Sequence, residues 1–500
     1  MKHLQNFGFT HKCGILMPIS SLPSPYGIGS FGREAYRFVD FLSRTGQTCW
    51  QVLPLNPTSY GDSPYQSPAS VAGNPYFIDL PTLVAEGLLR PDELAYAKKD
   101  CKRVDYGWLF GTRFSLLRVA HARFEPTSAY RAFCRKNAAW LEDYALFMAL
   151  KVHNGYREWT RWEPQYRNHA EAVAHAEKFE KEASFWRWTQ YVFFSQWKAL
   201  RAYAGKQGIR IIGDMPIYVA HDSMDVWRAP DQFLLDGDGN PTLVAGCPPD
   251  GFSPDGQLWG NPIYNWERMR EDGFAWWRDR FGAAFALYDL VRIDHFRGFA
   301  SYYAIPYGDT TARNGRWIGA PGKELFDAVK AAYPRARIIA EDLGFITDDV
   351  RELLAYTGFP GMKVLQFAFS SPDCEYLPRT YTTDNCLVYT ASHDSDCTVS
   401  WAKGLNAYER ASFKRECPRD RGQSVTNALI ECAMRSRANL CVIPMQDYLE
   451  LDGAEGRMNT PSRADGNWQW RLSPRYATKA LTERILDMAR RTKRAKSGRT

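Results

Sequence analysis

The sequence lacks several features that mark common classes of protein. No C-x-x-C pair occurs among its 11 cysteines, which excludes zinc-ribbon and thioredoxin-like spacings. No run of 18 or more apolar residues occurs, so the sequence predicts no membrane-spanning helix. Residues 1–15 contain neither a continuous apolar stretch nor a small-residue cleavage site, and we expect no signal peptide. These absences predict a cytoplasmic protein with reduced, mostly buried cysteines.

Most of the chain also lacks a charge excess. The formal net charge of the 500 residues is +7, but the last eleven residues hold six basic side chains and no acidic one: Arg490, Arg491, Lys493, Arg494, Lys496 and Arg499. The remainder is close to neutral, which argues against a nucleic-acid-binding surface. We therefore expect 490–500 to be a basic, frayed tail, and we predict neither nucleic acid nor a membrane as a partner.

Eight short apolar runs recur along the chain and alternate with helix-like segments. Several are apolar without interruption, as at Ile211-Ile212 and Ile338-Ile339, which is typical of strands buried on both faces. The pattern favours a (β/α)8 TIM barrel over the alternative, an open doubly wound sheet. The eight predicted strands lie within 14–20, 48–55, 209–219, 290–296, 337–343, 362–369, 386–392 and 440–446.

The chain is longer than a bare barrel, which has about 250 residues. We therefore predict a single catalytic barrel over 1–500 with two large insertions that form subdomains around the cleft. The first, at about 58–185, follows strand 2 and is mainly helical. The second, at about 220–268, follows strand 3 and is rich in Gly, Pro, Asn and Asp turns.

Four of the predicted strands end in carboxylates. Asp214, Asp294, Glu341 and Asp394 follow apolar runs, and His295 and His393 adjoin two of them. Because barrel chemistry lies at the carboxyl ends of the strands, we expect these side chains to meet in one site. A structural ring of ion pairs with Arg292 is the alternative, as is a metal site, although no H-x-H or H-E-x-x-H pair occurs.

Two carboxylates in different environments are what retaining glycosyl transfer requires. Arg292 and Asp294 lie two residues apart on one strand, so the cation is expected to lower the pKa of the Asp294 carboxyl and keep it ionised. That predicts Asp294 as the nucleophile and Glu341 as the general acid/base. Asp394 and the two histidines would bind sugar hydroxyls. Trp259, Tyr60 and Tyr65 are candidate sugar platforms.

Longer motifs around these residues resemble a known family. Arg-Ile-Asp-His-Phe-Arg-Gly at 292–298, Ala-Glu-Asp-Leu-Gly at 340–344 and His393-Asp394 resemble the three catalytic motifs of the α-amylase clan. The segments 62–67, 213–223, 256–262, 358–367, 457–461 and 466–468 narrow the resemblance to glycoside hydrolase family 77, the amylomaltases or 4-α-glucanotransferases. The resemblance extends from about residue 12 to 472.

The resemblance implies specific roles. Asp294 aligns with the family's nucleophile, Glu341 with its acid/base and Asp394 with its transition-state stabiliser. It implies sugar contacts for ten further residues, which are Arg292, His295, His393, Asp214, Trp259, Tyr60, Asp250, Gln257, Asn467 and Asp342. No metal or other cofactor is implied. Two positions depart from the family: Ser395 stands where Asn is usual, and Gly251 where Tyr is frequent.

The function implied is the transfer of 1,4-α-glucan segments through a covalent glucosyl-enzyme intermediate. The donors would be α-1,4-glucans and maltooligosaccharides, and the acceptors glucose or another glucan. Hydrolysis of α-glucans by the same chemistry and a catalytically inactive glucan-binding protein are the alternatives.

Overall fold

Eight parallel strands form the centre of the computed structural model, which describes residues 8–99, 101–249, 253–344, 346–461, 463 and 465–495. In spatial order they run β10-β11-β12-β1-β2-β3-β6-β9. The Ala340 amide on β9 donates to the carbonyl of Pro360, just before β10, at 3.0 Å, and so brings the two edges together. The strands are β1 (Lys12–Leu16), β2 (Cys49–Gln51), β3 (Arg210–Met215), β6 (Leu290–Ile293), β9 (Ile338–Ala340), β10 (Gly361–Val364), β11 (Cys386–Tyr389) and β12 (Leu440–Pro444). Each overlaps one of the eight predicted runs, although β1 begins two residues and β10 one residue before the predicted start, and the predicted TIM barrel is confirmed.

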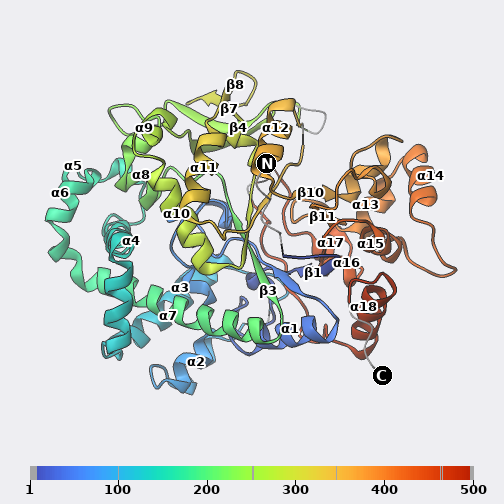
Figure 1. Cartoon of the computed structure of the whole chain (residues 1–500). Coiled ribbons are helices and arrows are strands. Elements are labelled where there is room, and N and C mark those ends of the chain that lie inside the picture. Colours follow the sequence, from blue (N-terminus) through green and yellow to red (C-terminus); the bar gives the residue numbers. More distant parts are fainter. Residues whose placement is uncertain are drawn as a thin grey trace.

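The strands are buried on both faces because helices cover the outside of the barrel (Figure 1). Nearly every residue of β1, β6, β11 and β12 is buried, as their continuous apolar sequences predict. The covering helices follow the strands in turn: α1 (Arg33–Arg44), α7 (Glu180–Lys206), α10 (Ala275–Leu287), α11 (Gly322–Ala332), α12 (Asp348–Thr357), α15 (Val425–Arg435) and α18 (Lys479–Arg491).

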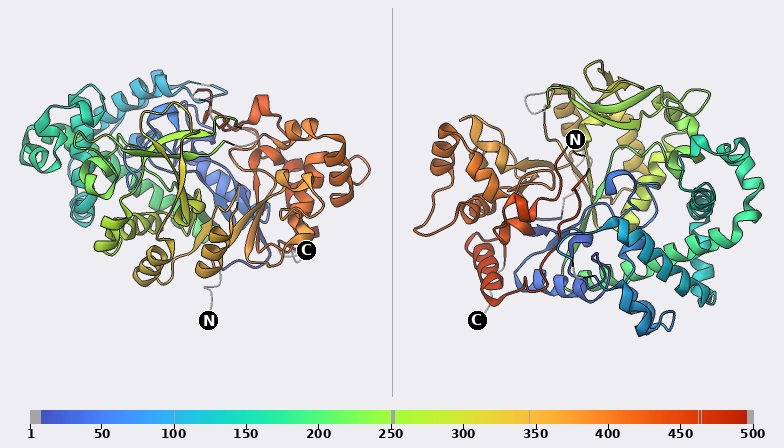
Figure 2. Two further views of the ribbon diagram at one scale, coloured as in Figure 1. Left: turned by 90° about the horizontal axis from the view of Figure 1, so that it is seen from above. Right: turned by 180° about the vertical axis from the view of Figure 1, so that it is seen from behind.

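A helical insertion separates β2 from β3. It contains α2 (Leu80–Ala85), α3 (Tyr106–Ala122), α4 (Ser128–His153), α5 (Pro164–Arg167) and α6 (His169–Ala174), and α4 packs along α7. Aromatic rings interlock between these two long helices, as in the edge-to-face pair Tyr144–Trp186. The insertion lies on the opposite side of the barrel from α13 (Thr398–Gly404) and α14 (Ala407–Glu416) (Figure 2). Much of the aromatic content is therefore packing.

A second, antiparallel sheet is the main element that the sequence analysis does not predict. Its order is β5-β4-β7-β8, formed by β4 (Leu243–Cys247), β5 (Gln257–Pro262), β7 (Ser301–Pro306) and β8 (Arg316–Gly319). Half of this sheet comes from the segment predicted to be turn-rich, 220–268, and half from beyond β6. Its central pairing joins β4 to β7 across the whole of α10 and β6, so no local sequence pattern marks that pairing.

The turn between β1 and α1 reads Gly27-Ile28-Gly29-Ser30-Phe31-Gly32, which has the G-x-G-x-x-G spacing of dinucleotide-binding turns. Here the glycines serve close packing. A Cβ at Gly29 would lie 1.9 Å from the Ile19 carbonyl oxygen, and one at Gly32 would lie 1.9 Å from Asp79 Oδ1. The closed barrel removes the open-sheet context in which that spacing indicates a nucleotide site.

The C-terminal residues are ordered further than the predicted frayed tail allows. The Arg494 side chain is fully buried and donates to the carbonyls of Met434, Lys12, Ser436 and Ala438 at 2.6, 2.8, 2.9 and 3.1 Å. The prediction of fraying is therefore wrong up to Ala495, because this guanidinium satisfies backbone groups in the core; 496–500 lie outside the described residues.

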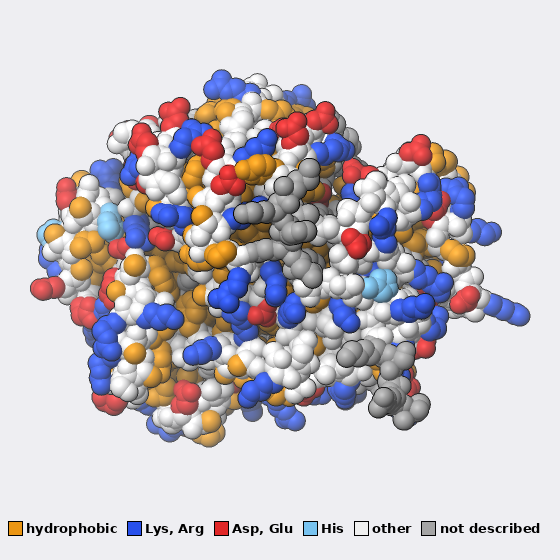
Figure 3. Space-filling model, viewed as in Figure 1, with side chains coloured by type: hydrophobic (Ala, Val, Ile, Leu, Met, Phe, Trp, Pro, Cys, Tyr) orange, Lys and Arg blue, Asp and Glu red, His pale blue; other side chains and the backbone are white. Residues whose placement is uncertain are grey.

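The surface gives two further observations. Lys and Arg side chains are spread over the face drawn in Figure 3 instead of gathering in one patch. Within the described part of the chain, no helix is both long and apolar enough to cross a membrane.

Candidate active site

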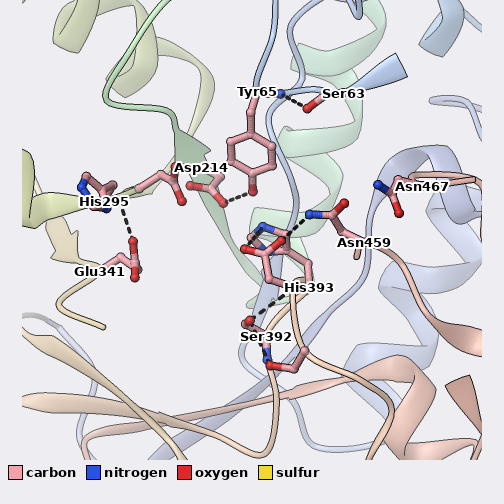
Figure 4. A network of polar contacts seen from close by, with 12 residues as sticks. Ser63, Tyr65, Asp214, His295, Glu341, Ser392, His393, Asn459 and Asn467 are labelled. Atoms are coloured by element: carbon pink, nitrogen blue, oxygen red, sulfur yellow. Dashed lines mark hydrogen bonds and ion pairs between the residues drawn. The ribbon is translucent and has the colours of Figure 1, made fainter. Parts of the chain in front are cut away.

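The strand-end carboxylates gather at the carboxyl ends of the barrel strands around Arg292. Asp214 lies on β3, Asp294 directly follows β6 and Glu341 directly follows β9. Asp394 lies on the loop after β11, close enough for its charge to raise the pKa of Asp294. Figure 4 shows Asp214 and Glu341 on one side of the site and His393 on the other.

Arg292 is the centre of this cluster, and its side chain is buried. Its Nη1 lies 2.6 Å from both carboxylate oxygens of Asp214 and 3.1 Å from Oδ1 of Asp294. Its Nη2 lies 3.9 Å from Glu341 Oε2. One cation therefore contacts three carboxylates, so the predicted structural ring and the predicted reactive pair are parts of the same arrangement.

Glu341 is held by the backbone that follows β6. Its Oε2 accepts a 2.5 Å hydrogen bond from the amide of His295, whose φ of 50° is in the left-handed region. The Phe296 amide donates to the Glu341 carbonyl at 3.1 Å, and the Glu341 amide donates to Ile293 at 3.0 Å. Because His295 and Phe296 directly follow Asp294 in the chain, these bonds fix the position of Glu341 relative to Asp294.

Burial separates the acidities of the two carboxyls. It raises the pKa of Glu341 to about 8 and the pKa of Asp294 to about 6, although the positive charge of Arg292 acts in the opposite direction on each. The prediction that Arg292 lowers the pKa of Asp294 is therefore wrong for the net effect, because loss of hydration outweighs the cation. The order of the two values still leaves Glu341 protonated and Asp294 ionised near neutral pH.

Asp394 extends into the site from a loop closed by hydrogen bonds. Its Oδ1 accepts from Asn459 Nδ2 at 2.6 Å, and its Oδ2 lies 3.4 Å from His393 Nε2. The Ser392 amide donates to Ser395 Oγ at 3.1 Å, and the two hydroxyls are 3.2 Å apart. Ser395, the departure from the family motif, therefore closes the turn that carries His393 and Asp394.

Two aromatic side chains border the carboxylates. The Tyr65 hydroxyl donates to Asp214 Oδ2 at 2.8 Å, and its ring stacks on His393 with centroids 5.2 Å apart. The Trp259 ring meets the His295 imidazole edge to face at 4.8 Å, and its Nε1 donates to Gln257 Oε1 at 3.1 Å. Burial lowers the pKa of His295 to about 4, so the imidazole is neutral at pH 7.

Of the predicted sugar contacts, two fall on residues that the structure does not describe and two make hydrogen bonds elsewhere. The side chain of Tyr60 and all of Asp250 lie outside the described residues, as does Gly251. Asp342 is buried and accepts the Met362 amide at 2.6 Å. Asn467 accepts the Thr460 amide and donates to the Arg463 carbonyl, each at 2.9 Å, which ties its own loop together. Sugar contacts by these four residues, and by the other six, stay predictions.

The structure adds Asn459 and a closer role for Tyr65 to the residues that sequence reasoning selects. Asn459 lies in the segment 457–461 and Tyr65 in the segment 62–67, both of which carry the family resemblance. Membership of these segments is the sequence signal that could have identified the two residues. No group of three or more His, Cys, Asp or Glu side chains suited to a metal occurs among the residues that the structure describes.

Comparisons with known proteins agree with this geometry. The model of glycoside hydrolase family 77, described as 4-alpha-glucanotransferase, matches residues 17–478. The 4-alpha-glucanotransferase of Streptococcus pneumoniae is 46% identical over 486 residues, covering 95% of this chain and 96% of the relative. That of Thermus thermophilus is 45% identical over 497 residues, covering 96% and 98%.

A solved structure is similar along almost its entire length. The amylomaltase from Streptococcus agalactiae in complex with acarbose superposes with a TM-score of 0.93 at 39% identity, covering 97% of this chain and all of the other. The amylomaltase from Corynebacterium glutamicum, at 18% identity and a TM-score of 0.76, shares the fold.

Proposed function

Because the chain belongs to glycoside hydrolase family 77 and is a 4-α-glucanotransferase, we propose that Asp294, Glu341 and Asp394 carry out its transfer of 1,4-α-glucan segments. The observation that carries the proposal is the pair of carboxyls on one guanidinium whose pKa values lie near 6 and 8. Such a pair supplies one nucleophile and one proton donor at the same pH.

The first half of the reaction breaks the donor's glycosidic bond. Glu341 gives its proton to the leaving oxygen while an oxygen of Asp294 attacks the anomeric carbon, forming the covalent glucosyl-enzyme and releasing the shortened chain. Loss of the Glu341 proton leaves a carboxylate, which the His295 amide and Arg292 stabilise from 2.5 and 3.9 Å. Arg292 also stabilises Asp294 before attack.

The second half transfers the segment to an acceptor. Glu341, now ionised, takes the proton from an acceptor hydroxyl, and the resulting oxygen displaces Asp294 from the anomeric carbon with net retention. Asp394 would bind sugar hydroxyls and stabilise the positive charge that develops on the ring. Its side chain is 45% exposed and so open to a ligand.

The donors in this proposal are α-1,4-glucans and maltooligosaccharides, and the acceptors are glucose or another glucan. The Streptococcus agalactiae relative, solved in complex with acarbose, supports an oligosaccharide as the ligand of this enzyme. Trp259 and Tyr65 border the carboxylates as aromatic surfaces for sugar rings.

Incubation with maltotriose tests transfer against hydrolysis. Transfer gives a ladder of longer maltooligosaccharides together with glucose, whereas hydrolysis gives only glucose and maltose. The Asp294→Asn variant is the control and should give neither set of products. Turnover by that variant at the wild-type rate would contradict the proposed nucleophile.

A donor with a good leaving group tests the two carboxyl roles separately. α-Maltotriosyl fluoride needs little protonation to lose fluoride, so Glu341→Gln should still form the covalent intermediate but release it slowly to an acceptor. Mass spectrometry of the denatured variant should then find one maltotriosyl unit on the peptide that contains Asp294. A label on any other peptide would reject the assignment.

A further inference from the structure

A buried carboxylate outside the reacting group holds both ends of the loop that carries His393 and Asp394. Asp447 lies in the short helix α16 (Met445–Tyr448), which directly follows β12. Its side chain is almost fully buried, as are those of Thr390 and Thr398, which flank the loop 391–397 on either side. Asp447 is thus a further carboxylate at the end of a barrel strand. It has no role in the transfer reaction proposed above.

The described hydrogen bonds of the Asp447 side chain all go to these two loop ends. Its Oδ2 accepts the hydroxyl of Thr390 at 2.6 Å and the hydroxyl of Thr398 at 2.8 Å. Its Oδ1 accepts the amide of Thr398 at 3.1 Å. One carboxylate oxygen therefore holds both Thr390, which directly follows β11, and Thr398, the first residue of α13.

Further hydrogen bonds connect the ends of the loop, which Asp447 holds, to its tip. Gln366 Nε2 donates to the Thr398 hydroxyl at 3.3 Å and to the Asp396 carbonyl at 2.9 Å. Above it, Ser392 and Ser395 close the turn around Asp394, as Figure 4 shows for Ser392. Asp394 itself is half exposed and makes one short side-chain hydrogen bond, to Asn459.

This arrangement carries an energetic cost in the core. Burying a carboxylate is unfavourable, and its three hydrogen bonds come from two threonines instead of a cation. The loop it holds carries a carboxylate whose position relative to the sugar ring must be accurate to a fraction of an ångström in the transition state. Because Asp394 at the tip of the loop is exposed, the two ends of the loop must be held rigidly.

We propose that Asp447 is a positioning residue for glucan transfer, which acts through Thr390 and Thr398 to hold Asp394 and His393 in their reactive geometry. The inference rests on the role proposed for Asp394. It assigns Asp447 no contact with substrate. Its loss should therefore lower the rate of the chemical step and leave ground-state binding of the donor nearly unchanged.

Asp79, at the start of α2, provides a matched control. It is also buried, and it also accepts a hydroxyl from one residue and a hydroxyl and an amide from a second: Ser30 at 2.8 Å and Thr82 at 2.8 and 3.0 Å. Asp79 caps α2 in the helical insertion and has no contact with the loop 391–397. The two carboxylates thus accept the same kinds of donor, two hydroxyls and one amide, but hold different parts of the chain.

The experiment compares Asp447→Ala with Asp79→Ala in the full-length enzyme, with maltotriose as donor. Both variants should lower the thermal unfolding midpoint by similar amounts. Asp447→Ala should also lower kcat by about tenfold or more with KM within about twofold of wild type, whereas Asp79→Ala should leave kcat within about twofold. Equal kcat for the two variants would overturn the proposal, as would a loss in Asp447→Ala that lies entirely in KM.

Milder variants keep the test decisive if Asp447→Ala does not fold. Thr398→Val removes one hydroxyl donor and keeps the side-chain shape, and it should lower kcat selectively. Asp447→Asn should recover most of the rate, because the two threonine hydroxyls can rotate to accept from its amide while its oxygen accepts the Thr398 amide. Wild-type kcat in Thr398→Val would contradict the proposal.

Failure of the wild-type enzyme to disproportionate maltotriose would instead contradict the proposed function.

Discussion

Arg292 and Asp214 form a buried ion pair in which one guanidinium nitrogen lies 2.6 Å from both carboxylate oxygens. The same nitrogen reaches Asp294 at 3.1 Å. Asp214 therefore shares with the proposed nucleophile a cation that would otherwise face only Asp294 and Glu341. This sharing links the stability of the barrel to the acidity of its reactive carboxyl.

Replacement of Asp214 should affect both properties. Asp214→Ala leaves Arg292 buried with less compensation, and we expect the free energy of unfolding to fall by about 3–5 kcal/mol in urea denaturation. The negative charge of Asp214 raises the pKa of Asp294, so its loss should move the acidic limb of the activity profile to lower pH. Tyr65→Phe, which removes only a hydrogen bond to Asp214, is the control and should cost about 1 kcal/mol. An unmoved acidic limb in Asp214→Ala would refute the link.

The pH dependence of kcat/KM should be bell-shaped with apparent pKa values near 6 and 8. The acidic limb reports ionisation of Asp294 and the alkaline limb loss of the proton from Glu341, since burial raises both pKa values to that range. Glu341→Gln should remove the alkaline limb from the residual activity. Persistence of both limbs in that variant would reject Glu341 as the acid.

The sequence predicts the barrel and the strand-end carboxylates because both depend on local pattern. Continuous apolar runs mark doubly buried strands such as β12, and the carboxylates follow these runs directly. The sheet β5-β4-β7-β8 could not be predicted, because its central pairing joins residues about sixty apart, such as Val244 and Ile305. The net pKa of Asp294 also depends on burial, which no spacing along the chain reveals.

Glu341→Gln should also stabilise the folded protein near neutral pH. Below the ordinary carboxyl pKa of 4.5, the folded and unfolded states are both protonated and the group contributes no difference. Between 4.5 and about 8 the unfolded state ionises while folded Glu341 keeps its proton, so the stability of the wild type falls as pH rises. Glutamine does not titrate. We expect a gain of about 2–4 kcal/mol at pH 7 and none at pH 4, measured by urea unfolding. An equal difference at both pH values would count against the raised pKa.

At position 395, substitution by asparagine, which is usual in the family, should affect the enzyme less than substitution by alanine, which removes the hydroxyl. Ser395→Ala removes the bonds to the Ser392 amide and hydroxyl and should lower the unfolding free energy by about 1 kcal/mol, together with kcat. Asparagine can accept the Ser392 amide through its side-chain oxygen, so Ser395→Asn should keep most of the rate. Steady-state kinetics on maltotriose compares the two; equal rates would show that the closure of this turn is dispensable.

The basic C-terminal residues divide into a structural part and a dispensable part. Truncation after Ala495 should leave the unfolding transition unchanged, because Arg494 and its four carbonyl partners are retained. Truncation after Thr492 should cost roughly 2–4 kcal/mol, since these buried carbonyls lose their donor. Thermal unfolding of the two proteins, with the wild type alongside, measures the difference, and identical midpoints would contradict the role of Arg494.

Arg494 also bears on the order in which the chain is made. Its guanidinium joins the carbonyl of Lys12 on the first strand to carbonyls just before the last, and β1 itself pairs with β12. A ribosome delivers the N-terminus first, so β1 emerges long before the strand that must lie beside it. During synthesis one edge of β1 therefore stays unpaired until β12 and Arg494, more than 400 residues later in the chain, have also been made.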